Sequence, residues 1–368
     1  MREQSRGKPG LIFIMLKRIY SPIDKFTFST FFLVSLMLMF SPSPALALGD
    51  KYAGEFLKIG MGVREMSLGG SVIANPGGAS AVYWNPAALA ANPLLSGEFM
   101  HTEEFAGVLN LDYVALALPG LADWSYGFGF FRSGVDGIPD TRSALIDENG
   151  NGELDPGERL DFGKIGTFGA SENALFFAMA RQMNSRLNIG GTVKTLYKSL
   201  GVTNAWGVGF DLATQYQLFP DFLLGVILRD ATTTFLYYPD GNNEFIAPSL
   251  QLGAAYSLSP VFLPVIFRPS FGLDINLEGE TNQSDLNLGF ISAGVRLGME
   301  MQIKEHIMLR IGRDNLGSAH LGFGLKTPVG SLDYGLALSG SYAELGQSHR
   351  VGLTLHFVEL GNYLKKYL

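Results

Sequence analysis

Apolar and polar residues alternate with a period of two along most of the chain beyond residue 95. In 291–299 one face carries Ile291, Ala293, Val295, Leu297 and Met299, and the intervening positions are Ser292, Gly294, Arg296 and Gly298. The same pattern recurs in 186–197, 205–217, 267–277 and 349–358. Because successive side chains of a strand point to opposite faces, these segments are predicted as β-strands with one apolar and one polar face.

Two architectures satisfy this pattern: a soluble sandwich with its apolar faces in a core, and an outer-membrane barrel with its apolar faces in lipid. The polar faces are rich in glycine with single charges, as in a crowded lumen, and many segments have the roughly 9–11 residues of a membrane-crossing strand. Aromatic residues tend to stand near segment ends, as in an interfacial girdle: Trp206, Tyr216, Tyr256, Tyr342 and Phe357. These features favour an all-β fold, a transmembrane antiparallel β-barrel spanning 95–358.

About fourteen strands are predicted, and an even number returns both ends of the barrel to the periplasm. The candidate segments are 95–102, 108–118, 123–133, 172–183, 186–197, 205–217, 222–232, 249–259, 267–277, 286–300, 306–313, 319–326, 332–342 and 349–358. Short turns then fall on the periplasmic side, and the long stretches 134–171 and 233–248 fall outside, as in outer-membrane barrels. Residues 359–368 would form a periplasmic tail.

The first 47 residues have the pattern of a secretory signal peptide. A basic region precedes the apolar run Phe26–Phe40, and Ala45-Leu46-Ala47 supplies a small-residue cleavage site. The alternative is an N-terminal anchor, but this run is shorter than the roughly 20 residues of a spanning helix. The n-region is long, so either Met1 or Met15 could be the start. The expected location is the bacterial outer membrane.

Composition removes several classes of protein. The chain has no cysteine, which excludes a disulfide scaffold and thiolate metal sites. Its 27 basic and 34 acidic residues give a net charge of −7, so nucleic acid is not an expected partner. No zinc-protease, nucleophile-elbow or phosphate-loop motif is present, and we expect a protein without enzymatic activity. The alternative is an outer-membrane hydrolase whose Ser/His pair comes from distant strands.

Residues 48–94 differ from the barrel because they are rich in glycine and alanine and alternate poorly. They would form either an N-terminal loop or a short helix-and-turn plug inside the barrel mouth. Their motifs are Phe56–Gly60, Gly62-Val63-Arg64, Gly69-Gly70 and Ala81–Ala87, the last containing Tyr83-Trp84-Asn85-Pro86-Ala87. With these motifs the chain resembles the PorV/PorQ family, which is related to the FadL-like transporters.

The resemblance implies a fourteen-stranded FadL-like barrel whose N-terminal segment blocks the lumen. Some members of the family act in type IX secretion, with secretion-system components or exported cargo as partners. FadL moves hydrophobic ligands. We therefore expect a role in protein export or surface attachment, with a channel for hydrophobic small molecules as the alternative. Outer-membrane lipid is the expected surroundings in both cases.

One motif predicts a metal site within the outer insertion 134–171. Residues 147–158 match the calcium-loop pattern D-x-[DN]-x-[DN]-G-x5-E at every constrained position. The predicted calcium ligands are Asp147, Asn149, Asn151, the carbonyl of Glu153, Asp155 and Glu158. The alternative is a solvated acidic turn, because the same residue types are common in surface loops. A bound Ca²⁺ would stiffen the insertion.

Overall fold

The computed structural model divides the chain into two compact units, 1–48 and 49–368. It describes residues 54–121, 123–201, 203–241, 243–261, 263–277, 285–288, 291–338 and 347–367. The predicted signal peptide, with Met1 and Met15, lies outside the described residues, as do positions 48–53 of the predicted plug. The fold below is that of the second unit.

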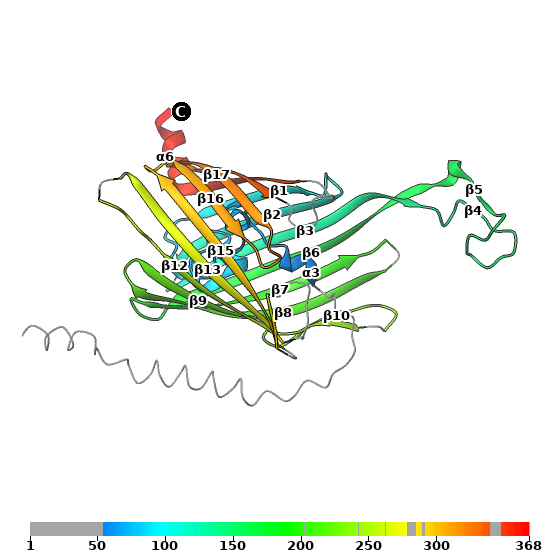
Figure 1. The fold of residues 1–368 in the computed structure, drawn as a ribbon, viewed down its shortest axis with the longest axis horizontal. Coiled ribbons are helices and arrows are strands. Elements are labelled where there is room, and N and C mark those ends of the chain that lie inside the picture. Colours follow the sequence, from blue (N-terminus) through cyan, green and yellow to red (C-terminus); the bar gives the residue numbers. More distant parts are fainter. Residues whose placement is uncertain are drawn as a thin grey trace, which may run out of the picture. The chain divides into compact units, whose positions relative to one another are not determined.

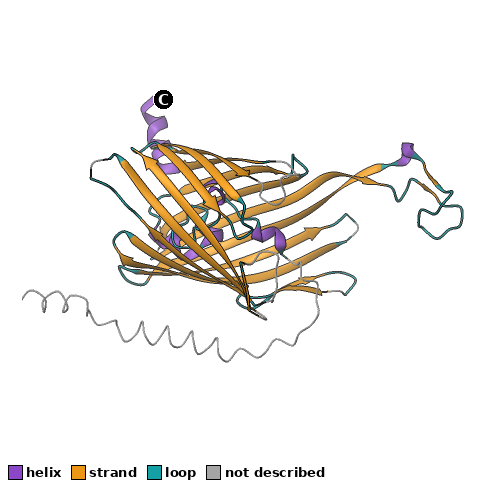
Figure 2. Ribbon diagram, in the orientation of Figure 1, coloured by secondary structure: helices purple, strands orange, loops and turns teal. Residues whose placement is uncertain are grey.

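Fourteen antiparallel strands of the described part follow one another around a closed ring (Figures 1 and 2). The ring closes because β1 pairs with β2 on one side and with β19 on the other. Its strands are β1 (Ser96–Glu104), β2 (Leu109–Leu121), β3 (Trp124–Asp140), β6 (Gly166–Gln182), β7 (Leu187–Ser199), β8 (Asn204–Phe219), β9 (Phe222–Arg229), β12 (Ser249–Tyr256), β13 (Val265–Asn276), β15 (Ile291–Ile303), β16 (Ile307–Arg313), β17 (Ala319–Thr327), β18 (Gly330–Leu338) and β19 (Ser348–His356). Each corresponds to one predicted segment, so the barrel prediction is confirmed.

The apolar face of the strands points outward and the polar face points into the lumen, as expected for a barrel in a membrane. On β8 the apolar side chain of Leu212 is 58% exposed on the outside, whereas its neighbour Asp211 is 3% exposed and faces the lumen. Lys194 on β7 and Arg296 on β15 are likewise buried inside. A closed barrel leaves no unpaired strand edge in lipid, and its apolar exterior matches hydrocarbon. This arrangement places the protein in the outer membrane.

Three connections depart from the predicted strand bounds. β3 and β6 remain paired as far as Asp140 and Gly166, well into the predicted loop 134–171. The insertion beyond them holds β4 (Leu145–Ile146), β5 (Arg159–Leu160) and η2 (Phe162–Lys164). A hairpin of β10 (Thr234–Tyr237) and β11 (Asn243–Ile246) extends the wall beside β8. The predicted strand 286–300 is instead two strands, β14 (Leu286–Leu288) and β15, which pair with each other.

Apart from η2 in the insertion, the helices of the described residues occupy two places. α3 (Glu55–Lys58), α4 (Val63–Ser67), α5 (Ala81–Trp84) and the 3-10 helix η1 (Pro86–Ala91) lie inside the barrel (Figure 1). At the other end of the chain, α6 (Phe357–Tyr367) starts at the residue after β19, where the sequence predicted the end of a strand and a tail. Within the described ranges, no helix combines the length and apolarity of a membrane span.

Candidate functional site

The lumen is blocked by residues 54–94, called the plug below, as the sequence predicted. The plug contacts the wall on opposite sides, because α4 packs on β16 to β19 and η1 packs on β6, β7 and β8. Much of its surface is buried, including Met61, Val82 and Ala87, which are at most 1% exposed. The lumen is therefore closed by the chain's own N-terminal segment.

The motif Tyr83-Trp84-Asn85-Pro86-Ala87 holds this segment together. The Tyr83 hydroxyl donates to the carbonyl of Leu57, and the Trp84 indole Nε1 donates to the carbonyl of Met61 at 2.7 Å. Asn85 has two roles. Its Oδ1 accepts from the Ala87 N–H at 3.0 Å and so begins η1, where Pro86 needs no hydrogen-bond acceptor for its nitrogen.

The amide of Asn85 also joins the plug to the wall. Its Nδ2 donates to the carbonyl of Ile73 within the plug at 2.7 Å and to the carbonyl of Thr214 on β8 at 3.0 Å. Asn85 is fully buried, so replacing this amide by an apolar group would leave backbone carbonyls without partners.

Glycines of the barrel wall make room for the plug backbone. A Cβ atom built on Gly190 of β7 would lie 2.6 Å from the Ala87 nitrogen. One built on Gly253 of β12 would lie 2.7 Å from the Ala74 nitrogen. Real Cβ atoms do not approach this closely, so these two glycines are seats for the plug.

Charged and polar side chains join the plug to the wall as well. Arg64 of α4 binds Glu300 of β15 through Nε at 2.9 Å and Nη2 at 3.3 Å. On another side, the Gln215 amide donates to the carbonyl of Ala74 at 2.9 Å, and the Thr192 hydroxyl donates to the carbonyl of Val82 at 3.2 Å. These partners were not identified from the sequence, where only single charges on the lumen face gave a signal.

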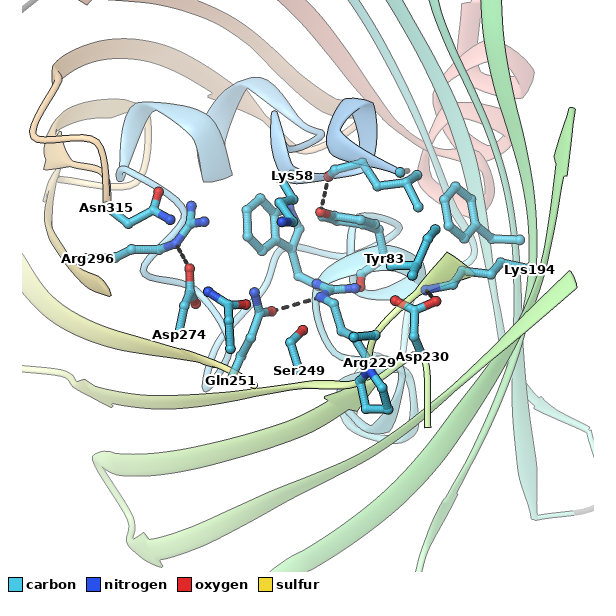
Figure 3. A pocket seen from close by; sticks show the side chains of 18 residues that line it. Lys58, Tyr83, Lys194, Arg229, Asp230, Ser249, Gln251, Asp274, Arg296 and Asn315 are labelled. Carbon is cyan, nitrogen blue, oxygen red and sulfur yellow. Dashed lines mark hydrogen bonds and ion pairs between the residues drawn. The ribbon is translucent and has the colours of Figure 1, made fainter. Parts of the chain in front are cut away.

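A pocket lies beside the plug and beneath the outer loops (Figure 3). Its apolar lining comes from both plug and wall: Leu57, Tyr83, Trp84, Phe176, Ile246 and Pro248. It offers about 60 Å³ to molecules the size of water, and by this measure one water needs roughly 10–15 Å³. The pocket therefore has room for only a few waters in this arrangement of the plug.

Three cations of the pocket, Lys194, Arg229 and Arg296, come from the wall and have partners there, whereas Lys58 of the plug binds Glu55 (Figure 3). Lys194 lies between Asp211 at 2.8 Å and Asp230 at 2.9 Å, and Arg296 binds Asp274 at 2.6 Å. The Arg229 guanidinium stacks 4.3 Å from the centre of the Tyr83 ring. Its Nη1 donates to the Tyr83 carbonyl at 3.0 Å, and its Nε donates to Gln251 at 2.8 Å.

Beside this pocket the closed ring is extended by the β10–β11 hairpin. β11 pairs with β10 on one side, and in the described part of the chain no strand pairs with its other side. The chain from Ile246 to Ser249, which includes Pro248, lines the pocket at this point. Proline cannot donate to a strand ladder, so the backbone here is suited to an edge rather than a continuous sheet.

A second hollow lies on the periplasmic side of the plug. It measures about 360 Å³ and is lined by the plug residues Asn75 and Asn92 and by the wall residues Gln182, Asn188 and Gln217. Its lining is mostly polar with one charged side chain, whereas the pocket on the outer side combines aromatic residues with six charged side chains. The plug therefore separates two chemically different spaces.

The predicted calcium loop is bracketed by the β4–β5 pair at the tip of the insertion. Asp147 accepts from the N–H of Gly150 at 2.6 Å and of Gly152 at 2.8 Å. Glu158 reaches back to the N–H of Glu148 at 2.9 Å and of Asp155 at 3.0 Å. The hydrogen bond from Gly152 is the main reason that the pKa of the Asp147 carboxyl is lowered.

The other predicted ligands converge on Asp155. Asn149 and Asn151 both direct their Nδ2 atoms at Asp155 Oδ2, at 2.5 and 2.7 Å. The Glu153 N–H donates to Asn151 Oδ1 at 2.8 Å. Among the described residues, no group of three or more His, Cys, Asp or Glu side chains is placed to hold a metal. A metal site here would also require the side-chain oxygens of Asn149 and Asn151. Both amides would have to rotate so that Oδ1, and not Nδ2, faces the ion.

The sequence matches no protein-family model, and no curated protein matches it. Among solved structures, the Pseudomonas putida toluene transporter TodX is 14% identical over 80% of this chain and 96% of its own, with a TM-score of 0.51. A Pseudomonas aeruginosa FadL homologue is 11% identical over 81% of this chain and 98% of its own, with a TM-score of 0.49. The Ralstonia pickettii toluene transporter TbuX is 14% identical over 80% and 97%, with a TM-score of 0.48. The likeness to TodX shows that the two chains share a fold.

Proposed function

We propose that this protein is an outer-membrane channel for small hydrophobic molecules, gated by its plug. The observation that carries the proposal is the pocket of Trp84, Tyr83, Phe176 and Ile246, enclosed between the plug and the wall beside the β10–β11 hairpin. Small-molecule sites usually have an apolar lining with a few fixed polar groups, and in this pocket the aromatic and aliphatic residues stand among six charged side chains. The fold is shared with TodX, whose substrate is toluene.

A ligand would reach the pocket beside the β11 edge, near Ile246 and Pro248. It would rest against the aromatic plug residues, above the polar hollow that opens toward the periplasm. Because the pocket has room for only a few waters, passage requires part of the plug to move. The alternative of a permanently open pore would need a continuous water-filled lumen.

The test is uptake of a small aromatic hydrocarbon into vesicles that contain the purified protein. Ile246→Arg places a long cation in the pocket and should lower the uptake rate at least about tenfold, because a desolvated charge would have to be displaced. Ile146→Arg is the matched control, since Ile146 is 47% exposed in the distant insertion. Equal rates for both variants, or wild-type uptake no faster than in empty vesicles, would refute the channel.

A second function, protein export or surface attachment, is favoured by the outer insertion. The β3–β6 ladder continues past the neighbouring strands, which pair only as far as Gly134 and Ser171. Its far end exposes Leu154 and Phe162, the latter to 81%. Exposed apolar groups on a projecting hairpin suit a protein contact, in agreement with the PorV/PorQ resemblance.

Deletion of residues 141–165 separates these two functions. If the protein acts in export, the deletion should abolish co-purification of secretion components or cargo from native outer membrane and leave hydrocarbon uptake unchanged. If no protein co-purifies with the wild-type chain either, the export role falls while the channel stands.

We further propose that the loop 147–158 binds Ca²⁺ and stiffens this insertion. Its carboxylates Asp147, Asp155 and Glu158 stand within one loop of twelve residues, and calcium prefers such oxygen ligands. Calorimetric titration should show one site in the wild type, loss of it in Glu158→Gln, and retention in Glu148→Gln, whose side chain is not a predicted ligand. Absence of saturable binding in the wild type would remove the proposal.

A further inference from the structure

The C-terminal helix α6 has one apolar face and one polar face. At 100° per residue, Phe357, Leu360 and Leu364 lie within one third of the helix circumference. The opposite side carries Glu359, Asn362, Lys365 and Lys366, with Val358 as its apolar exception. Phe357 and Leu364 are 39% and 47% exposed, so the barrel does not cover this face.

The start of α6 is fixed at the periplasmic rim. The Phe357 N–H donates to the carbonyl of Leu95, just before β1, at 3.0 Å. The Phe357 ring lies over Gly97, where a Cβ atom would come within 2.9 Å of it. From this point the helix leads away from the strands (Figure 1). The helix is therefore anchored at its first turn and extends outward from the barrel wall.

The apolar face of α6 continues the lipid-facing surface of the barrel. On β19 the outward positions are the odd-numbered ones, with Val351 49% and Leu353 42% exposed. Phe357 is the next odd-numbered outward position after Leu355, and it is also the first residue of the apolar helix face. The surface already in contact with hydrocarbon thus runs directly onto the helix.

We propose that α6 lies in the periplasmic interface of the outer membrane, with Leu360 and Leu364 in the lipid and Lys365 at the phospholipid headgroups. A helix with an apolar stripe and lysines on its polar side binds at this depth rather than spanning the bilayer. Its long lysine side chain can reach phosphate while the stem follows the apolar surface. The continuous apolar surface favours lipid over a protein partner, which would have to displace lipid already bound at this rim.

Site-directed spin labelling tests this placement directly, because the natural chain contains no cysteine. Single cysteines replace Leu360 and Leu364 on the apolar face and Asn362 and Lys365 on the polar face. Leu353→Cys on the barrel exterior is the lipid reference, and Glu153→Cys in the outer insertion is the water reference. Full-length protein is reconstituted in vesicles of phosphatidylethanolamine and phosphatidylglycerol, and heat-modifiable mobility on gels confirms that each barrel is folded.

The labels at 360 and 364 should be accessible to oxygen and at least about fivefold less accessible to a water-soluble nickel chelate than the label at 153. The labels at 362 and 365 should show the opposite preference. Nickel accessibility equal to that at 153 for all four positions would mean a helix free in the periplasm. Exclusion of both reagents at 360 and 364 would mean a contact with protein or a second copy of the chain, and either result overturns the proposal.

Discussion

Replacing Arg64 by glutamine removes the charged end of a contact that joins the plug to the barrel wall. The guanidinium binds Glu300 at 2.9 and 3.3 Å, and its Nη1 donates to Glu65 at 3.1 Å and to the carbonyl of Asn75 at 3.2 Å. Glu300 would still bind Arg310 at 2.8 Å and Arg268 at 3.2 Å. The substitution therefore weakens the plug without leaving Glu300 as an isolated buried charge.

The two remaining cations around Glu300 limit the free-energy cost of Arg64→Gln. Removing one partner of a buried ion pair costs about 3–5 kcal/mol when the other is left uncompensated. Here Glu300 keeps two cations, and Glu65 keeps hydrogen bonds from the Gly77 N–H and the Ser80 hydroxyl. The Arg64 side chain is 21% exposed, so solvent screens part of the loss. We expect Arg64→Gln to destabilise the seated plug by about 1.5–2.5 kcal/mol, which corresponds to a roughly 10- to 70-fold larger displaced population.

Hydrogen exchange of peptides from 54–94, followed by mass spectrometry in micelles, measures that population because exchange of the buried amides requires displacement. The matched control is Arg132→Gln, since Arg132 pairs with Asp112 and Asp136 on the barrel and not with the plug. Faster exchange of plug peptides in Arg64→Gln, with barrel peptides unchanged, is the expected result. Identical plug exchange in wild type, variant and control would show that Arg64 does not hold the plug.

Three further changes probe the same structure. Ser71→Cys with Ser270→Cys should form a disulfide between plug and wall, because the two hydroxyl oxygens lie 2.7 Å apart, and should stop hydrocarbon uptake until a reductant is added. Gly190→Val should raise plug exchange by pressing on the plug backbone, at a cost of about 1–3 kcal/mol, whereas Gly166→Val, with open space around it, should not. Leu212→Arg on the lipid face should lower barrel stability by about 2–4 kcal/mol in refolding titrations, and an unchanged midpoint would contradict the membrane orientation.

The strands were predictable because their signal is local. Wherever one face meets lipid and the other meets the lumen, every second residue must be apolar, and each predicted segment in such a region corresponds to an observed strand. The segments predicted for β3 and β6 are shorter than the observed strands, because the outer parts around Gly137 and Gly169 carry no such alternation. Outside the membrane a strand has no face in contact with lipid and needs no apolar residue at every second position. Strand pairing there is therefore not visible in the pattern of apolar residues.

The end of β19 shows the opposite error. Phe357 and Val358 follow the apolar positions of the strand and were predicted as its last residues, yet they begin α6. Two consecutive apolar residues break the alternation, and the later spacing of Leu360 and Leu364 is helical. The change of period from two to about 3.6 marks this boundary in the sequence itself.

The contacts of the plug could not be predicted in the same way. The motif around Asn85 indicated a turn inside the lumen, but Arg64 and Glu300 are 236 positions apart, and only closure of the barrel brings them together. Any lumen-facing charge of the wall was an equal candidate from the sequence. The sequence pattern predicts whether a residue faces the lumen or the lipid. Which residue it contacts depends on the register of the strands that separate the two in the barrel.

The polar lumen also permits the displacement of the plug that the proposed channel requires. The apolar face of each strand points outward to lipid, so the opposite, polar face points to the plug. The wall therefore offers hydrogen-bonding groups to the plug, such as Gln215 and Thr192. Water can replace such bonds when the plug shifts, so each contributes only about 0.5–1.5 kcal/mol net. At glycines such as Gly190 the plug backbone packs closely on the wall. No wall side chain has to move there when the plug is displaced. A plug held in this way is stable when seated, yet its displacement exposes polar groups of the wall that water can satisfy.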